Sequence, residues 1–192
     1  KIQHLKLRAR NPLYDAREVF LFECYTGIRI SDILTLKWKH ITDEKISIRM
    51  RKTEKLLSIP INDYVRAVLD RRRCAVENNG GKITSEKYVF NILKVDVDEV
   101  SAQDALNAIS SATAVINKQL KKIAKKTGID KNLSTHCARH SYATALLTNN
   151  IPLPVIKEML GHSDIKVTQI YAKVVDSKRN EVVECLNKVY HG

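Results

Sequence analysis

The chain has 192 residues, 44% of them hydrophobic, which is enough to build a core and excludes a largely disordered segment. No run approaches the roughly 20 apolar residues that a membrane-spanning helix needs. The charged start, KIQHLKLRAR, has no apolar stretch of the kind that signal peptides contain. We therefore expect a cytoplasmic protein with no membrane partner.

The charge balance indicates a polyanionic partner. Thirty-three Lys and Arg residues against 21 Asp and Glu residues give a net charge of +12 and a pI near 9.6. Such a charge attracts nucleic acid at long range and gains affinity from counterion release, although a solvated basic surface is the alternative. The cysteines are scattered without a C-x-x-C pair, so we expect reduced thiols rather than a zinc knuckle or a disulfide framework.

The first third of the chain predicts two helices and a β-hairpin. Residues 15–25 (DAREVFLFECY) have the apolar spacing of a buried helix, which ends at Gly27. Ser31 is placed to cap a second helix. Residues 45–50 and 56–61 alternate apolar and polar side chains, which predicts two strands joined by a basic turn.

The remaining two thirds are predicted to be mostly helical. Asn62 is placed to cap a helix that continues to residue 75, and a short strand is expected at residues 88–91. A long helix is expected at residues 101–126, closed by Gly128. Three shorter helices follow at residues 137–149, 153–160 and 176–190. These elements predict a mostly α fold with a small antiparallel β-sheet (α+β), in one domain over residues 1–192.

Three sequence motifs contain residue types that act on phosphate. STHCARHSYAT contains His136 and Arg139, and LGHSDIKVTQIY contains His162 and Tyr171. Far upstream, TGIRISD contains Arg29. STHCARHSYAT and LGHSDIKVTQIY together place one guanidinium, two imidazoles and a phenol within one short helical region, where they can converge on one phosphate.

Together these motifs resemble the catalytic domain of the tyrosine recombinases, the phage-type integrases and Xer-type recombinases, over most of the chain. The resemblance implies the fold of that domain and a site-specific recombinase or integrase that cleaves and rejoins DNA through a 3′-phosphotyrosine, without metal, ATP or another cofactor. It implies double-stranded DNA as partner and a nucleoid-associated location. It also implies a homo-tetramer on paired DNA sites that is weak or monomeric without DNA, and accessory DNA-bending proteins as further partners. Residue 1 is Lys rather than Met, so we expect the chain to be a fragment. The resemblance implies that a helical core-binding domain normally precedes it.

The resemblance assigns Arg29 and Arg139 to the scissile phosphate. A phosphodiester attacked in line gains negative charge on its non-bridging oxygens, and guanidinium forks bind such oxygens bidentately. Asp32 resembles the family's acidic residue that orients these cations. Its place in the first turn of a predicted helix, where a carboxylate is favoured anyway, is a structural alternative compatible with that role.

Tyr171 is the predicted nucleophile, since it alone among the seven tyrosines follows LGHS by the family's interval. A tyrosine with an ordinary pKa near 10 is ionised in only about one molecule in a thousand at neutral pH, so it needs cationic neighbours and a proton acceptor. His136 lies three residues before Arg139, so both side chains can share a helix face. The resemblance makes His136 a candidate base or hydrogen-bond partner of the phosphate, and makes His162 a contact to a non-bridging oxygen. Positions at helix ends are the alternative for both histidines.

Lys52 is the predicted general acid. The departing 5′ oxygen needs a proton, and a lysine on a mobile hairpin turn can deliver one if nearby cations lower its pKa. Lys52 in RMRKTEKLLSIP matches the family's hairpin lysine. Arg51 and Lys55 compete for the role on the same turn, and a solvated lysine is the structural alternative.

Other motifs favour simpler explanations. A zinc site at His136, Cys137 and His140 is opposed by the adjacent Arg139. GGKIT lacks the earlier glycine of a phosphate-binding loop, so no ATP site is expected.

Acidic residues precede or begin the long predicted helix, whose dipole favours them, so we expect them to be solvated rather than to bind a catalytic metal. They are Asp96, Asp98, Glu99 and Asp104. Two basic runs are expected either to follow the DNA backbone or to be solvated: Arg71 to Arg73, and Lys121, Lys122, Lys125 and Lys126.

Two other functions remain open at this point. The first is a catalytically silent DNA-binding module of the same fold, which would need none of the six catalytic positions. The second is DNA relaxation of the type IB topoisomerase kind, which shares the phosphotyrosine chemistry but does not exchange strands.

Overall fold

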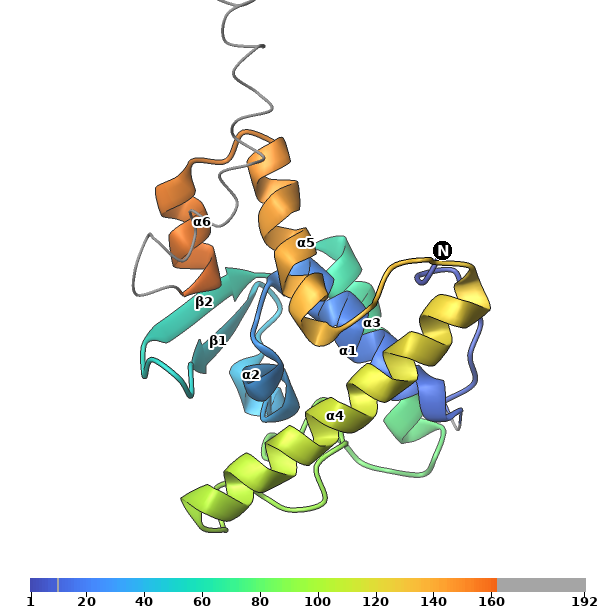
Figure 1. The fold of residues 1–192 in the computed structure, drawn as a ribbon. Coiled ribbons are helices and arrows are strands. Elements are labelled where there is room, and N and C mark those ends of the chain that lie inside the picture. The colour runs from blue at the N-terminus through green and yellow to red at the C-terminus, as the bar shows by residue number, and fades with distance from the viewer. Residues whose placement is uncertain (10, 162–192) are drawn as a thin grey trace, which may run out of the picture. The chain divides into compact units, whose positions relative to one another are not determined.

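The computed structural model describes residues 1–9 and 11–161, and Figure 1 shows its fold. The chain divides into two compact units, Lys1–Tyr142 and Ala143–Gly192. The first contains most of the helices and strands found in the described residues, including the two-stranded antiparallel sheet. The prediction of a mostly helical protein with a small antiparallel sheet is therefore confirmed. Within the described part of the chain, no helix is both long enough and apolar enough to cross a bilayer.

Helix α1, Pro12–Thr26, is the central helix of the first unit and contacts both α3 and α4. It begins earlier than the predicted residue 15, because the Asn11 side chain caps the helix by accepting a hydrogen bond from the Leu13 amide. Ten of the 15 residues of α1 are buried, including Phe22, which packs edge to face against Phe90 at 5.2 Å between ring centroids.

The segment after α1 turns sharply because Gly27, at φ 67°, adopts the left-handed conformation that ends the helix. Helix α2, Ile30–Leu34, follows at once, with Arg29 as its N-cap residue. The prediction that Ser31 caps this helix is wrong. The glycine turn starts the helix two residues earlier, so Ser31 lies inside it.

The predicted hairpin is confirmed by strands β1, Lys45–Arg49, and β2, Leu56–Pro60, which pair antiparallel. Cross-strand pairs Ile46↔Ile59 and Ile48↔Leu57 bury their side chains, while the residues between them face outward. This alternation sets the register, since a slip of one residue would expose the apolar face.

Helix α3, Asp63–Glu77, begins as predicted, with the Asn62 side chain accepting from the Val65 amide at 2.9 Å. Arg71 to Arg73 were expected to be solvated or to face DNA, and for Arg72, which is buried, this is wrong. Arg71 pairs with the fully buried Glu18 of α1 at 2.9 Å, and Arg72, itself 5% exposed, pairs with Asp15. These two ion pairs join α3 to α1.

The loop after α3 is held by a buried lysine. Lys37, 5% exposed, pairs with Asp98 at 2.8 Å and with Asp96 at 3.0 Å, and the Tyr88 hydroxyl donates to Asp96 at 2.8 Å. Burial alone would lower the pKa of Lys37, but the hydrogen bonds that Lys37 donates to Asp98 and Asp96 raise it above its ordinary value. Asp98 is exposed, as expected, but both aspartates are also ion-paired to Lys37, which the sequence did not indicate.

The strand predicted at residues 88–91 is reduced to one antiparallel bridge, between Lys37 and Tyr88. The Val89 amide donates to the Leu36 carbonyl at 2.8 Å, but the chain bends at Val89 and Phe90 and turns at Asn91, so no strand continues from the bridge.

Helix α4, Ala102–Thr127, agrees with prediction at both ends. The Ser101 side chain caps its first turn, and Gly128, at φ 61°, ends it. Helix α5, Thr135–Thr148, begins two residues before the predicted start, and α6, Leu153–Leu160, has the predicted bounds. The helix predicted at residues 176–190 lies outside the described residues.

Glu23 on α1 predicts an unusual dependence of stability on pH. It is 2% exposed, and burial raises the pKa of its carboxyl to about 9, which the nearby Arg139 charge only partly opposes. The unfolded chain has an ordinary glutamate pKa of about 4.3, so between these values the unfolded state releases a proton that the folded state keeps. The Glu23 contribution is therefore complete below about pH 4 and is lost as pH rises toward 9.

Glu23→Gln should remove this dependence. Urea unfolding from about pH 5 to about pH 8 should show a fall in the free energy of unfolding that is shallower in the variant, by up to about 1.4 kcal/mol per pH unit. Glu99→Gln, at an exposed position, is the matched control and should leave the profile unchanged. Equal slopes in Glu23→Gln and the unmodified chain would contradict the assignment.

Candidate active site

The TGIR motif forms a buried turn between α1 and α2. The Thr26 hydroxyl donates to the Phe22 carbonyl at 2.7 Å and accepts from the Ile28 amide at 3.3 Å, which closes the end of α1. The Gly27 carbonyl accepts a hydrogen bond from Arg139 Nη1 on α5. Arg139 is 8% exposed, so its guanidinium is held in place by the same turn that presents Arg29. The structure thus brings the two predicted arginines to one region.

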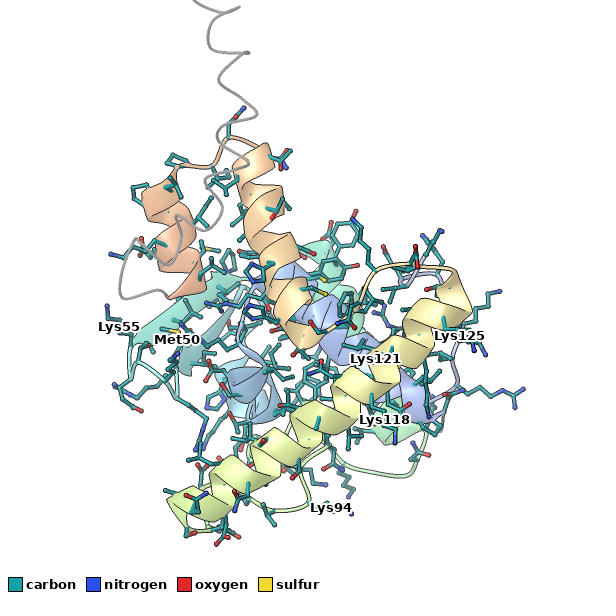
Figure 2. All side chains as sticks on the ribbon, viewed as in Figure 1. Met50, Lys55, Lys94, Lys118, Lys121 and Lys125 are labelled. Atoms are coloured by element: carbon teal, nitrogen blue, oxygen red, sulfur yellow. The ribbon has the colours of Figure 1, made fainter. Side chains whose placement is uncertain are left out.

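Arg29 also contacts the hairpin. Its Nη1 donates to the thioether sulfur of Met50 at 3.2 Å, and Met50 is 1% exposed. Met50 was not among the predicted site residues, because nothing in a methionine's sequence position indicates that its sulfur accepts from a particular arginine 21 residues away. Figure 2 shows Met50 beside the hairpin turn that bears Lys55.

Asp32 connects α2 to the hairpin turn. Its Oδ1 accepts from the Arg51 backbone amide at 2.9 Å, and the residue is 3% exposed. Burial raises the pKa of Asp32 above its ordinary value, while the Arg51 amide and the charges of Arg29 and Arg139 act in the opposite direction. These interactions place Asp32 among the cations that it is predicted to orient.

Lys52 follows Arg51 directly on this turn. The turn is closed by hydrogen bonds from the Met50 amide to the Lys55 carbonyl and from the Glu54 amide to the Met50 carbonyl, both at 2.9 Å. Lys52 itself is exposed, and it makes no hydrogen bond or ion pair with any residue that the structure describes. Its backbone thus follows directly after the Arg51 amide that is hydrogen-bonded to Asp32, while its side chain extends into solvent.

The start of α5 is capped and tied to α4. The Ser134 hydroxyl accepts from the Cys137 amide at 3.3 Å, and the Ser134 amide donates to Cys137 Sγ at 3.1 Å. The Thr135 amide donates to Asn117 of α4 at 2.9 Å. His136 is therefore the second residue of a helix whose first turn is fixed by the Ser134 cap and by the hydrogen bond to Asn117 of α4.

His136 has a histidine partner on the same helix. His136 Nε2 and His140 Nε2 are 2.7 Å apart, and the two rings meet edge to face with centroids 4.2 Å apart. His140 had been considered only as a zinc ligand, although its spacing of four residues from His136 was visible in the sequence. Among residues 1–9 and 11–161, no three His, Cys, Asp or Glu side chains gather as metal ligands would.

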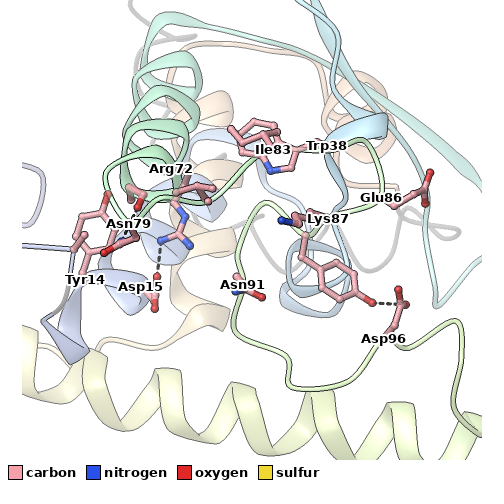
Figure 3. Close-up of a pocket in the computed structure, with 15 residues that line it drawn as sticks. Tyr14, Asp15, Trp38, Arg72, Asn79, Ile83, Glu86, Lys87, Asn91 and Asp96 are labelled. Carbon is pink, nitrogen blue, oxygen red and sulfur yellow. Dashed lines mark hydrogen bonds and ion pairs between the residues drawn. The ribbon is translucent and has the colours of Figure 1, made fainter.

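Two predicted site residues, His162 and Tyr171, lie outside the described residues. The predicted residues within the described part are Arg29, Asp32, Lys52, His136 and Arg139. They come from the turn after α1, the hairpin turn and the first two turns of α5. A pocket of about 550 Å³ lies elsewhere and is lined by none of the predicted residues. Figure 3 shows the ion pair between Arg72 and Asp15 at its wall.

The chain belongs to the phage integrase family, whose profile matches residues 7–178. It is 48% identical over 160 residues to the tyrosine recombinase XerD of Listeria monocytogenes, covering 82% of this chain and 49% of the relative. It is 30% identical over 163 residues to the tyrosine recombinase XerA of Saccharolobus solfataricus, covering 84% and 47%. The chain thus spans about half the length of these relatives.

Solved structures agree on the fold. The XerH recombinase in a post-cleavage complex with a palindromic difH substrate superposes with a TM-score of 0.64 and 21% identity, over 97% of this chain and 48% of that one. The XerA recombinase superposes with a TM-score of 0.61 and 22% identity, over 88% and 56%. The fold is that of the tyrosine recombinase catalytic domain, as the sequence motifs predicted.

The Asp32–Arg51 hydrogen bond can be tested without DNA. Asp32→Ala removes the acceptor, so hydrogen exchange at the Arg51 amide should accelerate by at least about tenfold, the size of one lost buried hydrogen bond. Asp32→Asn keeps an oxygen acceptor and should preserve most of the protection. Asp43→Ala, an exposed position before the same hairpin, is the control. Unchanged exchange in Asp32→Ala would mean that the turn is held by its own backbone bonds.

Proposed function

We propose that this chain is the catalytic domain, over residues 1–192, of a site-specific recombinase that cuts and rejoins double-stranded DNA through a covalent tyrosine link. The observation that carries the proposal is the joining of three segments around Asp32: the turn bearing Arg29, the hairpin turn bearing Lys52, and the first turns of α5 bearing Arg139. Membership of the phage integrase family supports it.

In the proposed reaction, the Tyr171 phenol oxygen attacks the scissile phosphorus and the bond to the 5′ oxygen breaks. Arg29 and Arg139 stabilise the negative charge that develops on the non-bridging oxygens, with His162 as a further donor. His136 accepts the phenol proton, and Lys52 gives a proton to the departing 5′ oxygen. Rejoining reverses these transfers when a free 5′ hydroxyl attacks the phosphotyrosine, so the bond energy is conserved and neither ATP nor metal is consumed.

Exposed lysines support a DNA partner. Lys118, Lys121 and Lys125 extend from α4, and Lys55 extends from the hairpin turn (Figure 2). Each phosphate that such residues neutralise should change the slope of log affinity against log salt by about −0.9. We extend the proposal to a homo-tetramer on paired sites that is weak or monomeric without DNA, to accessory DNA-bending proteins and to action at the nucleoid. This extension rests on family resemblance alone.

The covalent link is tested with a nicked suicide duplex that carries the binding site selected from random DNA. The unmodified chain should form a protein–DNA adduct, and Tyr171→Phe should lose the adduct while keeping its affinity for the duplex. Tyr64→Phe, at an exposed position on α3, should form the adduct normally. Absence of any adduct would favour the silent DNA-binding module, and relaxation of supercoiled plasmid without strand exchange would favour the topoisomerase.

The role of Lys52 is tested by changing the leaving group. Lys52→Ala should cleave an ordinary strand about 10²- to 10⁴-fold more slowly. It should recover most of this loss on a strand with sulfur at the 5′ bridging position, because a thiol with a pKa near 8.5 departs without protonation. Arg51→Ala and Lys55→Ala are matched controls on the same turn. An equal defect of Lys52→Ala on both substrates would assign the lysine to charge stabilisation instead.

A further inference from the structure

The His136–His140 contact allows only certain proton arrangements. Two imidazole nitrogens 2.7 Å apart must share one hydrogen, because two lone pairs or two N–H groups at that distance repel. One Nε2 is therefore the donor and the other the acceptor. In a neutral imidazole, the state of one ring nitrogen determines the state of the other, so this hydrogen bond also sets where the remaining proton of each ring lies.

The surroundings identify His140 as the acceptor. His140 is half-buried, and burial, the neighbouring His136 ring and the Arg139 guanidinium all lower the pKa of its imidazole. Arg139 keeps its charge and is fixed by the Gly27 carbonyl, so it disfavours a second positive charge on the adjacent residue. His136, by contrast, is exposed, and its Nδ1 has no hydrogen bond to any described residue.

We propose that His140 is a positioning residue that accepts a hydrogen bond from His136 Nε2 and so holds the lone pair of His136 on Nδ1, ready to take a proton. This inference rests on the proposed function. When the Tyr171 phenol transfers its proton to His136 Nδ1, His136 becomes an imidazolium whose Nε2–H already has a neutral acceptor. Hydrogen bonds from a charged donor are about twice as strong as neutral ones, so His140 stabilises this state. The proton returns to the phenol oxygen when the strand is rejoined.

The bland alternative is that two histidines one helical turn apart simply touch. Residues at this spacing on a helix are neighbours in any sequence. In a contact of that kind either ring could be the donor, so no single tautomer of His136 would be selected, and replacing His140 by any residue that preserves the helix would leave His136 unchanged. The two explanations therefore differ in a property that can be measured on the protein alone.

The first measurement is the tautomer of His136 by long-range ¹⁵N–¹H NMR correlation, without DNA, at a pH of about 7.5. The unmodified chain should show the Nε2–H form of His136 alone. His140→Leu should give a mixture of both tautomers, and His140→Gln, whose amide oxygen can accept, should restore the single form. His136 found as the Nδ1–H form, or an unchanged tautomer in His140→Leu, would overturn the proposal.

The second measurement is single-turnover cleavage of the same nicked duplex. His140→Leu should slow cleavage by about tenfold, the size of one lost hydrogen bond, with an unchanged Kd for DNA, and His140→Gln should recover most of the rate. His4→Leu, an exposed histidine outside the site, is the control. Thermal unfolding of both His140 variants confirms that they fold. A rate in His140→Leu equal to that of the unmodified chain would also overturn the proposal.

The NMR measurement of the His136 tautomer is made without DNA, so it does not depend on whether the protein cleaves DNA. If the unmodified chain forms no adduct, the proposed function fails while the tautomer assignment still stands or falls on its own measurement. If the adduct forms but the tautomer of His136 is indifferent to His140, only the positioning role fails.

Discussion

The carboxylate of Asp32 lies buried among positive charges, and the arrangement of the candidate site depends on how that charge is balanced. An unpaired carboxylate in such a place would cost several kcal/mol. Here the Arg51 amide and the charges of Arg29 and Arg139 offset part of that cost. The turn after α1, the hairpin and α5 are consequently coupled, because each supplies part of the environment that makes the buried carboxylate tolerable.

Some basic residues of this protein form ion pairs in its interior, which the composition did not reveal. The net charge of +12 suggested a basic surface, yet some of the cations are internal. Arg17 and Arg71 neutralise the buried Glu18, and Lys37 is enclosed by aspartates. These pairs fix the packing of α1, α3 and the following loop, so the exposed lysines of α4 remain as the more specific sign of a nucleic-acid partner.

The sequence predicted those elements of the fold that depend on residues close together in the chain. The alternation of β1 and β2 and the caps at Asn62, Ser101 and Gly128 depend on neighbours a few residues away. The partners of Lys37 are 59 and 61 residues distant, and no periodic pattern connects them. The motifs likewise identified Arg29 and Arg139 as candidates, whereas Met50 emerged only from the packing of the hairpin. His140 was an intermediate case, because its spacing from His136 was visible but its hydrogen bond was not.

Arg139 and Lys52 differ in when their side chains lose conformational freedom. Arg139 is buried and bonded to the Gly27 carbonyl, so its rotamer entropy is already lost when the chain folds. Lys52 is exposed, and ordering such a side chain costs up to about 2 kcal/mol. In the proposed reaction this entropy would be lost only on the DNA complex. Phosphate binding through Arg139 would then be rigid and entropically inexpensive, and delivery of the proton by Lys52 would be the more temperature-sensitive step.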